Sequence, residues 1–238
     1  MVYLNTVMLL NLISLILSPF TKSFLKKLQK NESAQKVVKL YGEDKFTGIR
    51  FWDAPFIEVE RFIPKKGKIL DLGCGEGIFT NYLGLSSPLR NIIGIDLDET
   101  RIKKANHGVK NVAFFYGDAI KYEMPRVDCI IMFHLLHHLS SLKDQENLIK
   151  RCSENLPKDG RLIIVEVEPK FSLKYFLAWS TDHFLVPWLF EKRFYSEVFF
   201  RSSYDWRKLI GGFGFSCTIT DASKEKPFSH MIFSCRKR

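Results

Sequence analysis

Three glycines and an acidic residue stand where an apolar, strand-like segment ends. Asp71-Leu72-Gly73-Cys74-Gly75-Glu76-Gly77 follows the apolar run that begins at 68. Glycine allows the backbone to turn tightly and to approach a ligand closely, and a helix that follows offers free N–H groups at its start. The spacing differs from that of a dinucleotide-binding turn, because Ile78 replaces its third glycine. It also differs from a Walker loop, since no Gly-Lys-Ser/Thr follows.

Two more acidic residues follow the next two apolar runs. Asp96 comes 25 residues after Asp71 and is suited to accept hydrogen bonds from ribose hydroxyls. Asp118 follows Gly117, where its carboxylate could accept a hydrogen bond from an adenine amino group. Each acid alone could be a helix N-cap or a solvated side chain. Together they mark the ends of three strands, and open α/β sheets bind ligands at that edge.

The elements that must position these residues alternate between strand and helix. Near-continuous apolar strands separated by helices predict a parallel sheet covered on both faces, and right-handed crossovers make it a doubly wound α/β domain. Helices are expected at 98–105, 141–156 and, ending at glycines, 203–215. Strands are expected at 68–73, 91–97, 112–116, 127–133 and 161–167, with a closing hairpin at 215–220 and 230–236.

These residues and elements closely resemble the class I S-adenosylmethionine-dependent methyltransferases, over about 66–167 and more loosely over the terminal hairpin. The resemblance implies a Rossmann-like sheet of order 3-2-1-4-5-7-6 with strand 7 antiparallel. It also implies S-adenosylmethionine as cofactor, with S-adenosylhomocysteine as product, and in-line methyl transfer. The cofactor-binding residues that it implies are Asp71, Gly73, Cys74, Gly75, Gly77, Asp96, Leu97, Asp118, Ala119 and Phe133.

Three histidines follow the fourth strand, where the family places residues that face the acceptor: His134, His137 and His138. Histidine has an ordinary pKa of about 6.5 and suits a general base near neutrality. His137 and His134 are therefore the candidate catalytic residues, with a structural or orienting role as the alternative. Ubiquinone O-methyltransferases bind a divalent metal with two glutamates and a histidine here. Because histidines replace the glutamates, and magnesium prefers oxygen ligands, no metal is expected.

Two segments lie outside the regular alternation. Residues 171–200 hold eleven aromatics in thirty residues. This composition is consistent with a helical lid that covers an apolar substrate, and equally with an aromatic layer of the core. We divide the chain into an amino-terminal helical segment, 1–45, and a methyltransferase domain, 46–238. The apolar run at 7–17 is short for a membrane span of about 20 residues and lacks a preceding positive region. It could bind a membrane interface with the lysines that follow, pack on the protein, or insert.

Composition narrows the function classes. The 238 residues are 46% hydrophobic and carry a net charge of +10, which is typical of a folded protein that favours anionic partners. Five cysteines without a CxxC pair predict reduced thiols. We therefore expect a cytoplasmic protein, with residues 1–30 as a candidate peripheral contact at the inner face of the membrane.

The expected acceptor is a hydrophobic or amphipathic small molecule: a lipid, a polyketide-like compound, or an isoprenoid or quinone. Methylation of nucleic acid or protein, or a non-catalytic membrane-associated relative, are the alternatives. A nucleic-acid partner is not favoured, because no separate RNA-binding module is visible and a basic charge alone does not make an RNA enzyme. The sequence leaves open the methylated atom and the oligomeric state.

Overall fold

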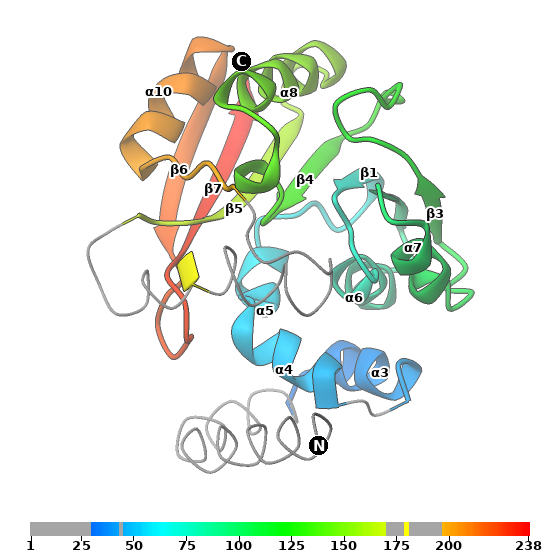
Figure 1. The fold of residues 1–238 in the computed structure, drawn as a ribbon. Helices are drawn as coiled ribbons and strands as arrows, with labels where there is room; N and C mark the ends of the chain where they lie inside the picture. The colour runs from blue at the N-terminus through cyan, green and yellow to red at the C-terminus, as the bar shows by residue number, and fades with distance from the viewer. Residues whose placement is uncertain (1–29, 43–44, 170–178, 181–196) are drawn as a thin grey trace.

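The computed structural model describes residues 30–42, 45–169, 179–180 and 197–238 (Figure 1). Seven strands form one sheet. Its strands are β1 (Gly67–Leu72), β2 (Arg90–Asp96), β3 (Val112–Tyr116), β4 (Cys129–Phe133), β5 (Arg161–Val167), β6 (Phe215–Asp221) and β7 (His230–Lys237). The helices in the described residues are α3 (Glu32–Leu40), α4 (Lys45–Asp53), α5 (Phe56–Glu60), α6 (Ile78–Ser86), α7 (Glu99–Ala105), the short 3₁₀ helix η1 (Leu136–His138), α8 (Leu142–Asn155) and α10 (Ser203–Gly212).

The strand order is β3-β2-β1-β4-β5-β7-β6, which confirms the predicted topology. Strands β1 to β5 pair in parallel. Strand β7 runs antiparallel between β5 and β6. The strand order reverses between β1 and β4: β2 and β3 lie on one side of β1, and β4 and β5 lie on its other side. Such a switch point is where open α/β sheets bind ligands.

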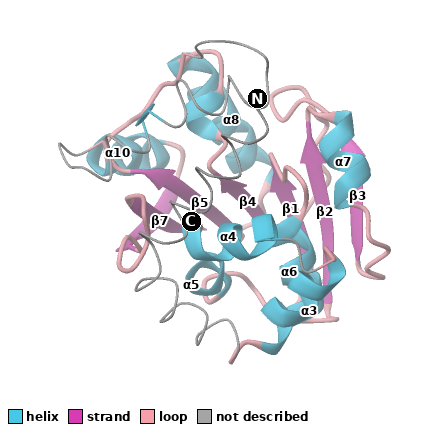
Figure 2. Ribbon diagram, turned by 60° about the horizontal axis from the view of Figure 1, so that its bottom comes forward, coloured by secondary structure: helices cyan, strands magenta, loops and turns pink. Residues whose placement is uncertain are grey.

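Helices cover both faces of the sheet, as Figure 2 shows. One apolar layer joins the sheet to α3, α4, α5 and α6, and the other joins it to α8 and α10. Alternate residues of β1 serve the two layers, with Ile69 in the first and Leu70 in the second. Both faces of these strands are therefore buried, which explains their near-continuous apolar sequence.

Helix α3 belongs to the first of these layers. Asn31 caps its start by accepting a hydrogen bond from the Ala34 amide at 2.9 Å. Ala34 and Val37 are fully buried, and the Asn31 amide donates to the Tyr82 hydroxyl of α6 at 3.1 Å. The carboxyl part of the expected amino-terminal segment thus packs on the sheet domain. The boundary at residue 45 stays a prediction.

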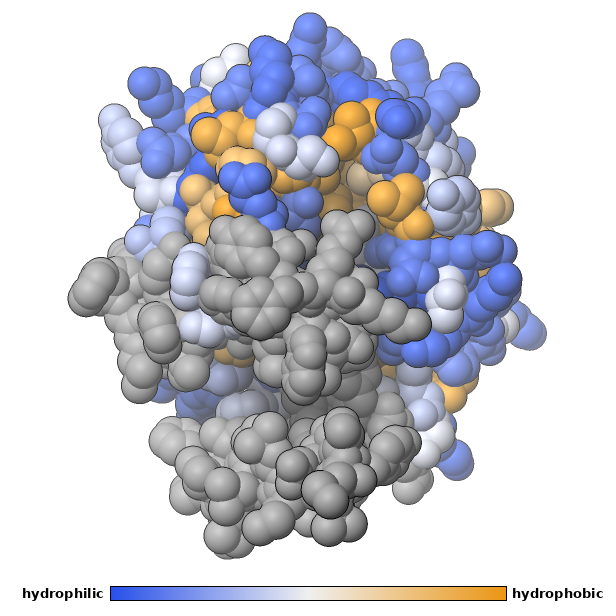
Figure 3. Space-filling model, in the orientation of Figure 1, coloured by the Kyte–Doolittle hydropathy of each residue, from blue (hydrophilic) through white to orange (hydrophobic). Residues whose placement is uncertain are grey.

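The surface of the described residues mixes polar and apolar side chains. In the upper half of the view in Figure 3, apolar side chains lie among hydrophilic ones. No helix in the described ranges combines the length and the apolar content needed to cross a bilayer. The apolar run at 7–17 lies outside the described residues, as does most of the aromatic insert at 171–200. Membrane contact and the lid therefore stay predictions.

The prediction of reduced thiols is wrong for two of the five cysteines. Cys217 and Cys235 form a disulfide, and their Cα atoms are 4.0 Å apart. They face each other on the antiparallel strands β6 and β7, a register that cysteine spacing alone does not reveal. Cys74, Cys129 and Cys152 are free thiols. Burial raises the pKa of Cys129 and of Cys152 to about 12, so both remain protonated.

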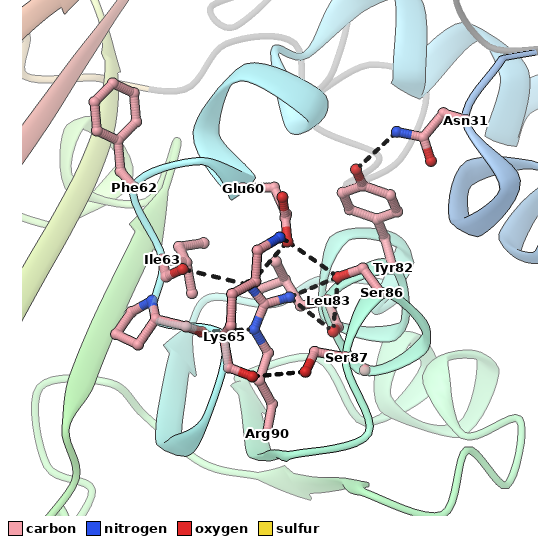
Figure 4. A network of polar contacts seen from close by, with 12 residues as sticks. Asn31, Glu60, Phe62, Ile63, Lys65, Tyr82, Leu83, Ser86, Ser87 and Arg90 are labelled. Atoms are coloured by element: carbon pink, nitrogen blue, oxygen red, sulfur yellow. Dashed lines mark hydrogen bonds and ion pairs between the residues drawn. The ribbon is translucent and has the colours of Figure 1, made fainter.

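A buried arginine organises the opposite, amino edge of the sheet (Figure 4). Arg90, at the start of β2, is inaccessible to solvent and donates to Glu60 Oε1 at 2.8 Å. Its other donors reach the Ser86 hydroxyl and three backbone carbonyls, those of Ile63, Pro64 and Leu83. Every N–H group of its guanidinium has an oxygen partner. We call Glu60, Lys65, Ser86 and Arg90 the amino-edge cluster; it joins α5, α6 and β2.

Candidate active site

The glycine motif forms a left-handed turn after β1. Gly73, Gly75 and Gly77 have φ angles of 73°, 57° and 71°, which residues with a Cβ rarely adopt. A Cβ at Gly73 would lie 2.8 Å from Leu135, and one at Gly77 would lie 2.7 Å from Ala105. A Cβ at Gly75 would meet no atom within 4 Å. The first and third glycines therefore permit close packing, and the second leaves open space beside the turn.

Asp96 holds this turn through its side chain. Its Oδ2 accepts a hydrogen bond from the Gly75 amide at 2.7 Å, and its Oδ1 accepts one from the Asp98 amide at 2.9 Å. The amides of Gly73 and Cys74 also donate to the Ile95 carbonyl, at 2.8 and 2.9 Å. The structure thus brings together the motif and the acid that ends β2, as the sequence predicts.

The remaining predicted cofactor residues flank that pair. Leu97 is 62% exposed beside Asp96, and it offers an apolar surface at the edge of the sheet. Asp118 accepts a hydrogen bond from the Ile120 amide at 2.9 Å after β3, and Ala119 is buried. Phe133, half-buried at the end of β4, packs edge-on against Phe79 with ring centroids 5.2 Å apart. All of them lie at the carboxyl edge.

Asp71 is a buried carboxyl with an unused acceptor. Its Oδ2 accepts from the Thr80 hydroxyl at 2.6 Å, whereas its Oδ1 is buried and has no hydrogen-bond partner. Burial raises its pKa to about 7, and the charge of Asp96 adds to this effect. Asp71 lies in the strand that leads into the glycine turn, and its unsatisfied acceptor fits a ligand that donates a hydrogen bond.

The candidate base His137 is held by a carboxylate. Its Nδ1 lies 2.5 Å from Glu166 Oε2, and the other oxygen of Glu166 accepts from the Leu136 amide at 2.9 Å. The ring of Phe200, from the described end of the aromatic insert, lies 5.0 Å from that of His137. His137 is 2% exposed. This geometry anchors η1 to β5.

The other candidate base, His134, contacts a different partner. Its Nε2 lies 3.0 Å from Nδ1 of His230, and His230 Nε2 lies 2.8 Å from the backbone carbonyl oxygen of Asp53. His134 has a φ of 52°, a conformation that only a few per cent of non-glycine residues adopt. His138, the third histidine after β4, is exposed. Across the described residues, no group of three histidine, cysteine or acidic side chains could hold a metal ion.

Sequence reasoning missed two residues of this region. The sequence predicts His230 only as the first residue of a strand, and no signal near it links it to His134. Gly94 did carry a signal, because a glycine inside an apolar strand often marks a close approach. A Cβ at Gly94 would lie 2.7 Å from Phe114 and 3.0 Å from Cys74 Sγ. The missing side chain therefore lets Cys74 pack against β2.

Comparison with known proteins agrees with this geometry. A family model described as a methyltransferase domain matches residues 43–220. Carboxy-S-adenosyl-L-methionine synthase of Nautilia profundicola is 31% identical over 113 residues, which cover 45% of this chain and 47% of that protein. Demethylmenaquinone methyltransferase of Thermotoga maritima is 26% identical and covers 51% and 52%, respectively. The matched part thus spans about half the length of these two relatives.

Solved structures show the same fold. Magnesium protoporphyrin IX methyltransferase from Synechocystis, with bound S-adenosylhomocysteine, superimposes with a TM-score of 0.62 at 17% identity, over 91% of this chain and 100% of that one. An S-adenosylmethionine-dependent methyltransferase from Aquifex aeolicus gives a TM-score of 0.60 at 18% identity, over 86% and 98%. The family match covers most of the chain, and the strand order agrees with these folds. The chain therefore belongs to the methyltransferase-domain family and has the fold of its S-adenosylmethionine-dependent members.

Proposed function

We propose that this protein transfers the methyl group of S-adenosylmethionine to a hydrophobic or amphipathic small molecule. The observation that carries the proposal is the hydrogen bond from the Gly75 amide to Asp96, which joins the glycine turn to the acid at the end of β2. Asp96 would hold the ribose hydroxyls, Asp118 the adenine amino group, and Asp71 a donor group of the methionine part. When bound, the sulfonium supplies a methyl carbon open to in-line attack.

The protein's own contribution is placement and exclusion of water. Holding a nucleophile and the methyl carbon close and aligned can lower a barrier by about 7–11 kcal/mol in favourable systems. At the end of β4, the ring of Phe133 contacts those of Phe56 and Phe79, each at 5.2 Å. Phe200 covers His137 beside it. These aromatic rings support an apolar acceptor.

The relatives support a small-molecule acceptor as well. They include proteins named as demethylmenaquinone, myricetin and mitochondrial ubiquinone-biosynthesis methyltransferases, at 26–31% identity. Two other relatives are instead named carboxy-S-adenosyl-L-methionine synthase. The product must therefore be identified, because a modified donor and a methylated acceptor would lead to different assignments.

The test combines donor binding with product analysis. Purified protein is incubated with methyl-labelled S-adenosylmethionine and an extract of the source cells, and the label is counted in organic and aqueous phases. We expect protein-dependent label in the organic phase, on a species one methyl group heavier than its precursor. Label on a polymer, a protein or a modified donor would contradict the proposed acceptor.

Asp96→Ala is the matched variant for donor binding. Loss of hydrogen bonds to a charged group costs about 1.5–3 kcal/mol, which corresponds to roughly 10- to 150-fold weaker binding. Calorimetric titration with S-adenosylmethionine measures this loss. Asp159→Asn is the control, because Asp159 is an exposed acid in the turn before β5 and pairs with Arg236. Equal donor affinity in the two variants would refute the role of Asp96.

A further inference from the structure

Two histidines from distant parts of the chain form a hydrogen-bonded chain that ends on the backbone. His134 follows β4 and His230 begins β7. Their nearest ring nitrogens are 3.0 Å apart and their ring planes differ by 16°. The far nitrogen of His230 lies 2.8 Å from the Asp53 carbonyl oxygen. The hydrogen-bonded chain therefore runs from His134 through His230 to the backbone of Asp53 in α4.

The chemistry of the last group sets the protonation of the others. A backbone carbonyl oxygen only accepts hydrogen bonds, so His230 Nε2 must carry a hydrogen. In neutral His230, Nδ1 is then the acceptor, and Nε2 of His134 must donate to it. The hydrogen of neutral His134 is thereby fixed on Nε2, and Nδ1 keeps its lone pair. In a neutral histidine, the hydrogen bond made by one ring nitrogen thus determines that the other nitrogen is the one able to accept a proton.

His134 lies beside the glycine turn. Leu72 pairs with Met132 in the sheet, so the chains of β1 and β4 leave the sheet next to each other at Gly73 and Phe133. Leu135 fills the space that a Cβ at Gly73 would need. The positive φ of His134 puts it in a sparsely populated conformation, and such residues cluster at functional sites. The histidine is therefore one residue beyond the sheet edge that carries the proposed donor site.

The partner helix α4 adds buried polar atoms that have no hydrogen-bond partner. Trp52 Nε1 and Asp53 Oδ1 are buried and unsatisfied, whereas Asp53 Oδ2 pairs with Arg50 at 2.6 Å. A buried donor or acceptor without a partner is costly. The same helix thus holds His230 and retains the capacity to bind a polar group.

The charged and titratable groups around His134 favour its neutral form. Burial lowers the pKa of His134 well below its usual range, and the groups that lower it further are His230 of β7, His137 and His138 of η1, and Arg50 of α4. Glu166 pairs with His137 rather than with His134. A neutral imidazole is thus available at pH 7. A base this weak suits an acidic hydroxyl, such as a phenol with a pKa of about 10, better than an alkyl alcohol.

We propose that Nδ1 of His134 accepts the proton of the methyl acceptor, and that His230 is the positioning residue that keeps this nitrogen unprotonated. The inference rests on the proposed function and specifies the reacting group as a phenolic or enolic hydroxyl. As the oxygen bonds to the methyl carbon, its O–H bond breaks and the proton moves to Nδ1. The electron pair of the broken carbon–sulfur bond stays on sulfur, which changes from a sulfonium to a neutral thioether.

The first test needs neither donor nor acceptor. Long-range ¹H–¹⁵N spectra of the full chain report which ring nitrogen carries hydrogen, and His134→Gln assigns the signals. We expect His134 to be protonated on Nε2 and bare on Nδ1 at pH 7.5. His230→Phe should give a mixture of the two tautomers. His230→Gln should restore the wild-type pattern, because its amide can donate to Asp53 and accept from His134. Protonated Nδ1 in the wild type, or an unchanged tautomer in His230→Phe, would overturn the proposal.

The second test separates this proposal from the proposed function. With labelled donor and cell extract, His230→Phe should lower product formation at least tenfold, and His230→Gln should recover most of it. Donor affinity should stay within twofold of wild type in both variants. Wild-type rates in His230→Phe would overturn the role of His230. Absence of donor binding in the wild type would instead refute the proposed function, while the tautomer assignment would stand on the spectra.

Discussion

The two edges of the sheet hold buried polar groups of opposite character. In the amino-edge cluster, every guanidinium N–H group of Arg90 reaches an oxygen. Toward the carboxyl edge, buried polar atoms without a hydrogen-bond partner occur on Trp52, Asp53, Asp71 and Asn81. His134, at the same edge, has a positive φ. Among the described residues, none of the unpartnered atoms belongs to the amino-edge cluster.

We interpret the amino-edge cluster as a group that holds the fold and the carboxyl edge as the proposed ligand site. A fully satisfied buried network makes a structure rigid, whereas an incompletely satisfied one costs stability. Native proteins keep few such exceptions, and each calls for a physical reason. The carboxyl edge has a reason, because donor and acceptor molecules would supply the missing partners. Two pairs of variants and one single variant sharpen the comparison, and the largest effect is expected at the amino edge.

Among these variants, Arg90→Met should lower the stability of the fold the most. The change leaves Glu60 without its buried partner, and breaking a buried ion pair from one side costs about 3–5 kcal/mol. For a chain of this size, each kcal/mol lowers the melting temperature by roughly 2–4 °C, so we expect a drop on the order of 10 °C. Thermal unfolding followed by circular dichroism measures it.

Lys65→Met is the matched control for Arg90→Met. Lys65 pairs with the same Glu60 oxygen, but its side chain is 65% exposed. Exposed ion pairs contribute about 0–1 kcal/mol, so the melting temperature should change little. Equal losses in the two variants would show that the buried network does not carry the stability assigned to it.

Asp71→Asn should change the pH dependence of stability. The pKa of Asp71 is raised to about 7 in the folded chain, above its ordinary value of about 3.9. The folded state therefore binds the proton more tightly than the unfolded state, and stability falls as pH rises from about 4 through 7. The variant removes this slope and should be the more stable protein at pH 8. Melting temperatures at several pH values test the sign.

Donor binding should respond to pH in the opposite direction. S-adenosylmethionine carries a sulfonium and an ammonium, and we expect a cationic donor to favour ionised Asp71. The dissociation constant of S-adenosylmethionine should fall several-fold from pH 6 to pH 8 in the wild type and should not change with pH in Asp71→Asn. A slope of equal size in both proteins would place the titrating group elsewhere.

Sequence reasoning reached the strands and the donor-side residues because their signals are local. An apolar run that ends in an acid or a glycine identifies both a strand and its carboxyl end. Gly75 contacts Asp96, and the charge of Asp96 acts on Asp71. The order of the strands came from the family resemblance rather than from the runs themselves.

The missed contacts are long-range and depend on register. The Cys217–Cys235 disulfide requires the pairing of β6 with β7, and the His134–His230 contact joins residues 96 apart. Likewise, the sequence offers no reason to bury Arg90, a charged residue, until Glu60 and the carbonyls around it are in place. Only the folded chain brings these partners together.

Apart from the control Lys65→Met, the smallest effect on folding should come from Gly75→Ala, which should also weaken donor binding. Gly75 has a φ of 57°, and a Cβ there meets no atom within 4 Å. The left-handed conformation alone costs about 1–2 kcal/mol. Gly108→Ala is a matched control, because Gly108 has a φ of 70° and equally open surroundings in the loop before β3. The two variants should therefore lose similar melting temperature.

Only Gly75→Ala should lose donor affinity, by at least tenfold, since its methyl group would occupy space beside the turn that the proposed donor needs. Calorimetric titration with S-adenosylmethionine compares the two variants directly. Wild-type affinity in Gly75→Ala would mean that the open space at the turn is not part of the donor site. The contrast between the two edges would then rest on Asp71 and the histidines alone.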